Sequence, residues 1–194
     1  YVFSGNNSIP YVEKDDAVPQ NVYGFSKLAG EREIERILKR HIIIRTSWVY
    51  GRFGNNFVKT MINLSKIKDI IECVDDQRSS PTAAKSVART ISFIIFKMLD
   101  AKDIDQRWGT YHFCGTPFIT WADFADEIFY QAHQKGIISS IPIVKRILTE
   151  SYPTFANRPK NSCLDCSKID NTFGIKKDEW KLSLSTVLDE IIRD

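Results

Sequence analysis

The 194-residue sequence lacks the features that mark several common classes of protein. Its four cysteines are too few for a disulfide framework in a chain of this length, so we expect a reduced, cytoplasmic protein. No apolar run reaches the roughly 18 residues that a membrane span needs, and no signal peptide is visible. The formal charge of +3 is too small and too evenly spread to indicate a nucleic-acid partner.

Two further absences concern glycine and the start of the chain. The nine glycines form no Gly-x-Gly-x-x-Gly loop of the kind that holds a dinucleotide's pyrophosphate. The chain begins with Tyr1-Val2-Phe3, which is typical of the end of a buried strand, without an initiator Met or a preceding turn. We therefore expect the sequence to be the C-terminal part of a longer protein.

The order of the predicted elements indicates an α/β fold. A helix is predicted over 22–39, with Asn21 as its N-cap. The β-branched, apolar run 42–50 follows at once and suits a strand buried on both faces of a parallel sheet. Gly30 lowers helix stability in the middle of the first helix, which suggests that another backbone approaches closely there. Further helices are predicted at 57–66, 83–99, 121–133 and 184–192 with a short one within 162–173, and strands at 1–3, 70–74 and 109–115 with a weak one within 136–145.

Side-chain spacing adds detail to the helices. One face of the first helix is predicted from residues that recur at helical spacing, namely Tyr23, Lys27, Gly30, Ile34 and Ile37. Thr82 is the predicted cap of the helix 83–99. Thr120 and Asp123 have the spacing of a capping box, which places a helix start directly after Thr120.

Tyr23 and Lys27 are the first candidate catalytic pair. They are four residues apart, so both side chains rise on the same face of the helix. A phenol beside an ammonium is a usable acid because the positive charge favours the phenolate. Such a tyrosine can protonate an alkoxide as a carbonyl is reduced. The spacing alone is equally typical of an exposed tyrosine on a solvated helix, since the chain has seven tyrosines.

The sequence around this pair is more specific. Short strings occur in order along the chain: Tyr1-Val-Phe-x-Gly5, Asn21-Val-Tyr-Gly-x-Ser-Lys27-Leu-Ala-Gly-Glu31, Ile44-Arg-Thr-Ser-Trp-Val-Tyr-Gly51, Gly54-Asn-Asn-Phe-Val-Lys-Thr-Met61, Tyr152-Pro-Thr154 and Arg158-Pro-x-Asn-Ser162. Together they resemble the dTDP-4-dehydrorhamnose reductase family, a branch of the extended short-chain dehydrogenase/reductases. The resemblance runs nearly end to end. Tyr-x-x-x-Lys marks only the superfamily, whereas the string ending at Gly51 and the last two strings are much narrower.

The resemblance implies a particular fold. It is the later part of a doubly wound, parallel, Rossmann-like sheet, joined to a smaller α+β substrate-binding domain. We assign 1–50 and 76–108 to the nucleotide-binding domain, and 51–75 and 109–194 to the substrate-binding domain.

The resemblance also implies an activity, the reduction of dTDP-4-dehydro-β-L-rhamnose to dTDP-β-L-rhamnose for cell-surface polysaccharide. NADPH is the expected cofactor, with NADH as the alternative, and a homodimer is compatible with the family. Tyr23 matches the tyrosine that protonates the oxygen at C4, and Lys27 matches the lysine that binds the nicotinamide ribose, so both would contact the cofactor. The third catalytic residue, a Ser or Thr, and the glycine-rich loop are absent, so the chain alone is expected to be inactive.

The dTDP-sugar substrate is expected to contact five residues, namely Tyr1, Trp48, Asn56, Gln77 and Arg158. Trp48 matches a tryptophan that lines the sugar pocket in the family, and its indole could stack on the apolar face of the sugar. Arg158 can meet a diphosphate with two parallel hydrogen bonds. Asn56 and Gln77 are equally well explained as loop caps, and Lys160 as a solvated surface charge.

Two alternative functions stay open. One is a nucleotide-sugar epimerase or dehydratase of the same superfamily. The other is a non-catalytic regulatory subunit, because the family includes the regulatory subunit of methionine adenosyltransferase. No metal site is expected: Cys163 and Cys166 have the spacing of half a zinc or redox site, but no second pair and no nearby His completes it. His112, in an apolar strand, is better explained as a packed, hydrogen-bonded side chain than as a ligand.

Overall fold

The computed structural model describes residues 1–100, 105–152, 154 and 156–192. Parallel strands alternate with helices along the chain, which confirms the predicted α/β class. The elements are, in order, α1 (Val22–Ile37), β1 (Ile42–Arg45), β2 (Val49–Tyr50), α2 (Phe57–Ser65), β3 (Ile70–Val74), β4 (Arg78–Ser79), β5 (Thr82–Ala83), α3 (Ala84–Met98), β6 (Gly109–His112), β7 (Ile119–Thr120), α4 (Trp121–Gln134), β8 (Ile143–Ile147), η1 (Thr149–Ser151), α5 (Ser167–Phe173) and α6 (Trp180–Ile192).

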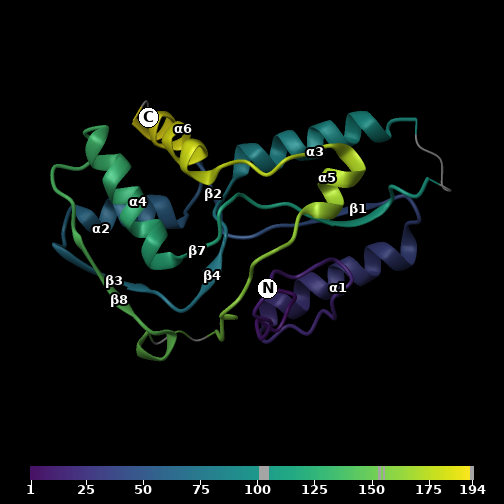
Figure 1. The fold of residues 1–194 in the computed structure, drawn as a ribbon, viewed down its shortest axis with the longest axis horizontal. Helices are drawn as coiled ribbons and strands as arrows, with labels where there is room; N and C mark the ends of the chain where they lie inside the picture. Colours follow the sequence, from purple (N-terminus) through teal and green to yellow (C-terminus); the bar gives the residue numbers. More distant parts are fainter. Residues whose placement is uncertain (101–104, 153, 155, 193–194) are drawn as a thin grey trace.

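The strands pair as β1 with β6, β2 with β5 and β3 with β8, all parallel, and β4 with β7, antiparallel. In the first pair Ile42 lies opposite Gly109, and Arg45 lies opposite His112. The helix α1 lies on one side of β1 and α3 on the other, while α2, α4, α6, β3 and β8 gather at the opposite end of the molecule (Figure 1).

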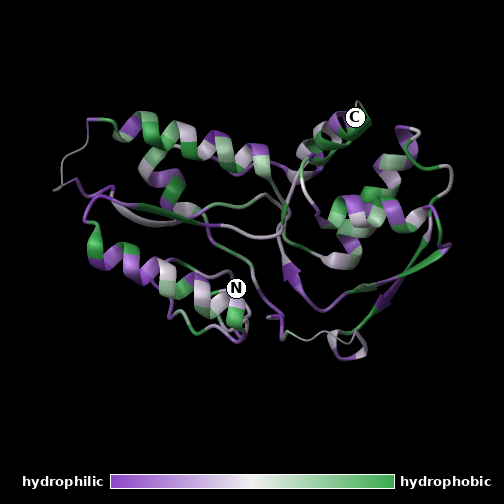
Figure 2. Cartoon of the chain, turned by 180° about the vertical axis from the view of Figure 1, so that it is seen from behind, coloured by the Kyte–Doolittle hydropathy of each residue, from purple (hydrophilic) through white to green (hydrophobic). Residues whose placement is uncertain are grey.

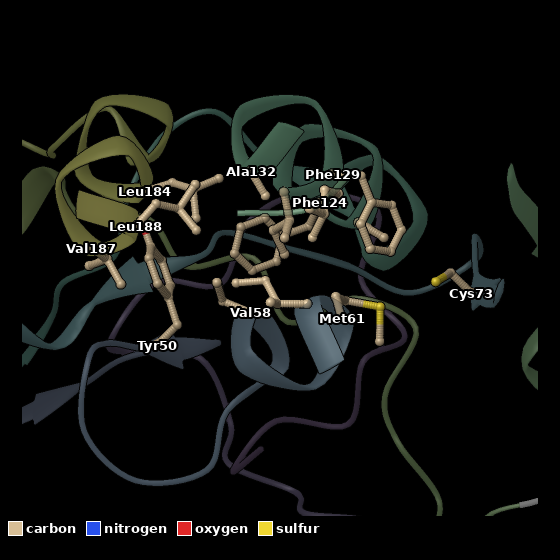
Figure 3. Close-up of a cluster of buried hydrophobic side chains, with 14 of the residues drawn as sticks. Tyr50, Val58, Met61, Cys73, Phe124, Phe129, Ala132, Leu184, Val187 and Leu188 are labelled. Carbon is tan, nitrogen blue, oxygen red and sulfur yellow. The ribbon is translucent and has the colours of Figure 1, made fainter. Parts of the chain in front are cut away.

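Two clusters of buried apolar side chains hold these parts together. The first, here called the β1 core, comprises Val2, Phe3, Tyr11, Leu28, Ile94, Met98, Tyr111, Phe113, Cys114, Leu164, Cys166, Ile169 and Phe173. The second, the α4 core, gathers side chains of α2, α4 and α6 around Phe124, with Tyr50, Val58, Met61, Phe129, Leu184 and Leu188 among them (Figure 3). Tyr111 and Ile169 pack in the β1 core, so the first cluster draws on both of the predicted domains. The predicted domain boundaries stay a prediction.

The exposed surface of α3 is partly apolar. Figure 2 shows hydrophobic residues along the length of this helix, interleaved with hydrophilic ones. The exposed large hydrophobic side chains of α3 are Ile91, Phe93, Ile95 and Phe96. Leu99, the residue directly after the helix, is also exposed. None of the helices within the described residues is both long enough and apolar enough to cross a membrane.

The run 42–50 forms two strands and not the single strand that was predicted. It is interrupted at residues 46–48, where Trp48 has a φ of 44°, the only positive φ of a described residue other than glycine. The ladder stops at this point, and β1 and β2 pair with different partners. The strand predicted at 1–3 is also wrong: Val2 and Phe3 are buried, but the segment has no ladder partner among the described residues.

Two of the predicted helix starts are confirmed, and two others need correction. Asn21 caps α1 by accepting a hydrogen bond from the Gly24 amide at 2.8 Å, and Thr120 and Asp123 form the predicted capping box of α4. Thr82 does not cap α3: it lies in β5, and Ala83 occupies the N-cap position without a side-chain hydrogen bond. The last helix begins at Trp180, earlier than predicted. The weak strand is β8, which begins within the predicted range and continues beyond it.

The helix α1 packs inward through a face other than the one that Tyr23, Lys27, Gly30, Ile34 and Ile37 mark. Gly24 and Leu28 are its buried residues, whereas the Tyr23 and Ile37 side chains are 59% and 64% exposed. A Cβ atom on Gly30 would meet nothing within 4 Å. On Gly24 it would overlap the Tyr1 carbonyl oxygen and lie 2.8 Å from the Pro19 Cβ. The close backbone approach inferred at Gly30 therefore occurs at Gly24.

These two glycines give a matched test of the packing of α1. Gly30→Ala should raise the free energy of unfolding by up to about 1 kcal/mol, because alanine is the better helix former and the added methyl meets open space. Gly24→Ala should lower it by roughly 1–3 kcal/mol, because the methyl is forced against the Tyr1 backbone. Urea unfolding of both variants measures the difference, and equal effects of the two substitutions would contradict the packing described here.

His112 is fully buried between the strand pair and the segment that carries Tyr11. Its Nδ1 atom lies 3.1 Å from the Tyr11 carbonyl oxygen, and its amide donates to the Glu13 carboxylate at 2.8 Å. The prediction of a packed, hydrogen-bonded histidine is confirmed. Burial, reinforced by the positive charge of Arg45, lowers the pKa of His112 to about 4. The imidazole is therefore neutral at pH 7.

This burial predicts a pH dependence of stability. The unfolded chain takes up a proton on His112 near the ordinary pKa of 6.5, and the folded chain does so only near 4. The contribution of neutral His112 to the free energy of unfolding is therefore fully present above about pH 6.5. The free energy of unfolding should fall by roughly 2–3 kcal/mol as the pH drops toward 4. His112→Gln should remove this part of the slope when urea unfolding is measured across the range. An unchanged slope in the variant would show that other groups cause it.

Candidate active site

A cavity of about 420 Å³ lies beyond the carboxyl end of β1. The N-terminal segment, α1, the interruption between β1 and β2, and the first residue of α4 all line it. Four of the predicted site residues meet there: Tyr1, Tyr23, Lys27 and Trp48. In parallel α/β folds ligands bind at this end of the strands, so the position agrees with a binding site.

Tyr23 and Lys27 lie on the exposed face of α1 next to this cavity. The Lys27 Nζ atom is 5.3 Å from the centre of the Tyr23 ring, and the Tyr23 ring meets that of Tyr1 edge to face, with centres 6.4 Å apart. Lys27 makes no ion pair with any of the described residues. Its ammonium is therefore available to a ligand, and its charge lies beside the Tyr23 phenol.

Tyr1 presents a half-buried phenol to the same cavity. Burial raises the pKa of Tyr1, and the charge of Arg158 and a hydrogen bond with the Trp48 side chain offset part of the rise. The hydroxyl therefore stays protonated at neutral pH and can donate a hydrogen bond to a ligand.

A largely buried ion pair joins α1 to β1 at the wall of the cavity. The Glu31 carboxylate accepts from Arg45 Nη2 at 2.7 Å and from Nε at 3.1 Å, and each side chain is only 12% exposed. The guanidinium also lies 5.1 Å from the centre of the Phe3 ring. Arg45 Nη1 and Thr46 Oγ1 are buried beside the cavity without a hydrogen-bond partner among the described residues.

Trp48 stacks on Trp121, a residue that the sequence analysis did not single out. The ring centres are 3.6 Å apart and the planes differ by 14°. Trp121 is the first residue of α4 and lines the cavity. The centres of the Trp121 and Phe57 rings are 4.5 Å apart. Its position could have indicated a functional residue, because Trp121 follows the capping Thr120 directly, at the junction of β7 and α4.

A second cavity, of about 810 Å³, shares Asn161 with the first. Arg158 and Lys160 line it. The Lys160 ammonium pairs with the Asp76 carboxylate at 3.2 Å, whereas Arg158 is exposed. The predicted loop around Arg158 includes residues 153 and 155, which lie outside the described residues.

Asn56 and Gln77 line neither cavity. Asn56 caps α2 by accepting from the Lys59 amide at 3.3 Å, and it donates to the Gly51 carbonyl at 2.7 Å. Gln77 is buried and donates to Thr149 Oγ1 at 3.1 Å. The structure thus gives both side chains local hydrogen bonds, and their contact with a substrate stays a prediction.

The four cysteines are free thiols. Cys166 lies with its sulfur 3.6 Å from that of Cys114, not paired with Cys163. In the part of the chain that the structure describes, no group of three His, Cys, Asp or Glu side chains is arranged to hold a metal ion.

Comparison with known proteins agrees with this geometry. The family model of the RmlD substrate binding domain matches residues 1–193. The chain belongs to this family. The dTDP-4-dehydrorhamnose reductase of Aggregatibacter actinomycetemcomitans is 42% identical over 187 residues, which are 96% of this chain and 63% of that protein. The reductase of Escherichia coli K12 is 37% identical over 191 residues, 98% of this chain and 63% of that one.

Solved structures confirm the predicted fold class of this RmlD-family chain. The dTDP-4-dehydrorhamnose reductase of Clostridium acetobutylicum superposes with a TM-score of 0.85 at 38% identity, over all of this chain and 64% of that one. The Bacillus anthracis reductase, solved in complex with NADP, gives 0.84 at 34% identity, over 97% of this chain and 62% of that one. The chain thus spans a little under two thirds of the length of these relatives.

Proposed function

We propose that this chain carries the substrate site and the proton donor of a dTDP-4-dehydrorhamnose reductase that uses NADPH. The observation that carries the proposal is the convergence of Tyr23, Lys27 and Trp48 on one cavity, in a chain 42% identical to such a reductase. The predicted division into a nucleotide-binding and a substrate-binding domain, a homodimer and a cytoplasmic location belong to the same proposal.

The residues at the cavity fit the nicotinamide end of NADPH. Lys27 has an ammonium that no described carboxylate engages, and it can donate to the ribose hydroxyls. The Tyr23 phenol is exposed beside it. Bound there, the cofactor would supply the hydride, and the protein supplies position and a proton.

Tyr23 is placed to donate that proton. As negative charge develops on the oxygen at C4 of the substrate, the phenol O–H bond breaks and the proton moves to this oxygen. The charge left on Tyr23 lies near the Lys27 ammonium, which stabilises it. Tyr1 can donate a hydrogen bond within the same cavity, and the Trp48 ring provides a flat apolar wall for the sugar.

The second cavity is suited to the nucleotide part of the substrate. Arg158 is an exposed guanidinium there, and a guanidinium binds a diphosphate with two parallel hydrogen bonds. Because Asn161 lines both cavities, a ligand that extends from one into the other would place its sugar near Tyr23 and its diphosphate near Arg158.

The direct test uses the full-length gene product with dTDP-4-dehydrorhamnose and NADPH. Oxidation of one NADPH for each dTDP-rhamnose formed is the expected result. An epimerase or dehydratase would transform a nucleotide sugar without net oxidation of NADPH. A regulatory subunit would show no turnover and would copurify with a stoichiometric partner enzyme.

Tyr23→Phe tests the proton donor. The variant should lower kcat at least about 100-fold, because general acids contribute 10²–10⁴-fold. The matched control is Tyr130→Phe, which removes a hydroxyl from a side chain that is 55% exposed on α4. A wild-type kcat in Tyr23→Phe would show that another group donates the proton.

Lys27→Met tests the ribose contact while keeping the length of the aliphatic chain. NADPH should bind roughly tenfold more weakly, because a charge-assisted hydrogen bond is lost, and turnover should fall as well. The control is Lys39→Met, an exposed lysine beyond the end of α1. Titration calorimetry measures the binding, and equal NADPH affinity in both variants would remove Lys27 from the cofactor site.

A further inference from the structure

The backbone of Trp48 is held in a conformation that bulky residues avoid. Its φ of 44° lies in the left-handed region, where a Cβ atom crowds the backbone. Such a conformation persists only when its surroundings determine it, and it occurs most often at functional sites. The Trp48 carbonyl accepts from the Thr82 amide at 3.1 Å, and the contacts of the side chain add to this backbone restraint.

The main aromatic contact of Trp48 is the Trp121 ring. The two rings stack nearly parallel at 3.6 Å, which is the tightest aromatic pair of the described residues. The Nε1 atom of Trp121 is buried and has no acceptor among the described residues. Its ring is therefore placed by packing between Trp48 and Phe57, not by a hydrogen bond of the indole.

Trp121 is itself held rigidly at the start of α4. The preceding residue, Thr120, forms the capping box with Asp123. The Thr120 hydroxyl also donates to the Asp75 carboxylate at 2.7 Å, which ties the helix start to the end of β3. The first residue of α4 thus has a fixed position relative to the cavity that it lines.

We propose that Trp121 is a positioning residue for substrate binding, which acts through Trp48. The Trp121 ring sets the height and tilt of the Trp48 indole at the sugar pocket, and the Trp48 ring makes the contact with the sugar. This inference rests on the proposed function, since it assigns the wall to the sugar of the nucleotide-sugar substrate.

The inference is tested by a double-mutant cycle in the full-length gene product. Trp121→Ala and Trp48→Ala should each raise KM for the dTDP-sugar by about tenfold, with kcat changed less than KM. The double variant should raise KM no more than about twofold beyond Trp48→Ala, because the second ring acts only through the first. The affinity for NADPH should stay unchanged in all three variants.

Two further variants separate positioning from general loss of structure. Trp121→Phe retains a stacking ring and should keep KM within about twofold of wild type, whereas Trp121→Leu keeps apolar bulk without the flat ring and should behave like Trp121→Ala. Trp108→Phe, outside the cavity, should have no effect on KM. Unfolding curves identify any variant that fails to fold, and the leucine and phenylalanine variants then give the comparison.

The outcomes are distinct for the two proposals. If the increases in KM of the two single variants multiply in the double variant, the positioning role is overturned. A wild-type KM in both Trp121→Ala and Trp121→Leu, while the wild-type protein reduces the sugar, would also overturn it. A rise in the NADPH dissociation constant would also overturn it. No reduction of the dTDP-sugar by the wild-type protein would overturn the proposed function and this inference with it.

Discussion

The interruption of the chain between β1 and β2 is the constraint on which the site depends. Residues before it pair with β6 and pack against the β1 core, while Tyr50 after it packs in the α4 core. One straight strand could not enter both cores with different ladder partners. The left-handed backbone at Trp48 makes the change of direction, and the cavity lies at that point, lined by residues from both parts.

The helix α1 has to be held against β1 for its side chains to reach this cavity. Gly24 permits contact between its backbone and that of Tyr1, and the Glu31–Arg45 pair ties a later turn of the helix to the end of β1. Removing one partner of a buried ion pair leaves an uncompensated charge, at a cost of about 3–5 kcal/mol for a fully buried pair. Steric fit at Gly24 and the ion pair at Glu31 together fix this part of α1, with Tyr23 directly before Gly24 and Lys27 between the two contacts.

Elements with strong local signals could be predicted from the sequence, and features set by tertiary contacts could not. Asn21 and the Thr120 capping box gave correct helix starts, because a cap acts within a few residues. A β-branched run gives no sign of a left-handed residue inside it, so the strand break at Trp48 was missed. The close approach was assigned to Gly30, because only the packed structure shows that Gly24 faces the neighbouring backbone. Trp121 was missed because its partner Trp48 is distant in sequence.

The chemistry of the cavity walls narrows the kind of ligand that fits it. Arg45 Nη1 and Thr46 Oγ1 are buried there without partners among the described residues, and a buried polar group left unpaired costs about 1–3 kcal/mol. The Trp48 ring, stacked on Trp121, adds an apolar wall. The sugar of the proposed substrate fits this lining, because its hydroxyl groups surround a largely apolar face that can rest on the Trp48 ring.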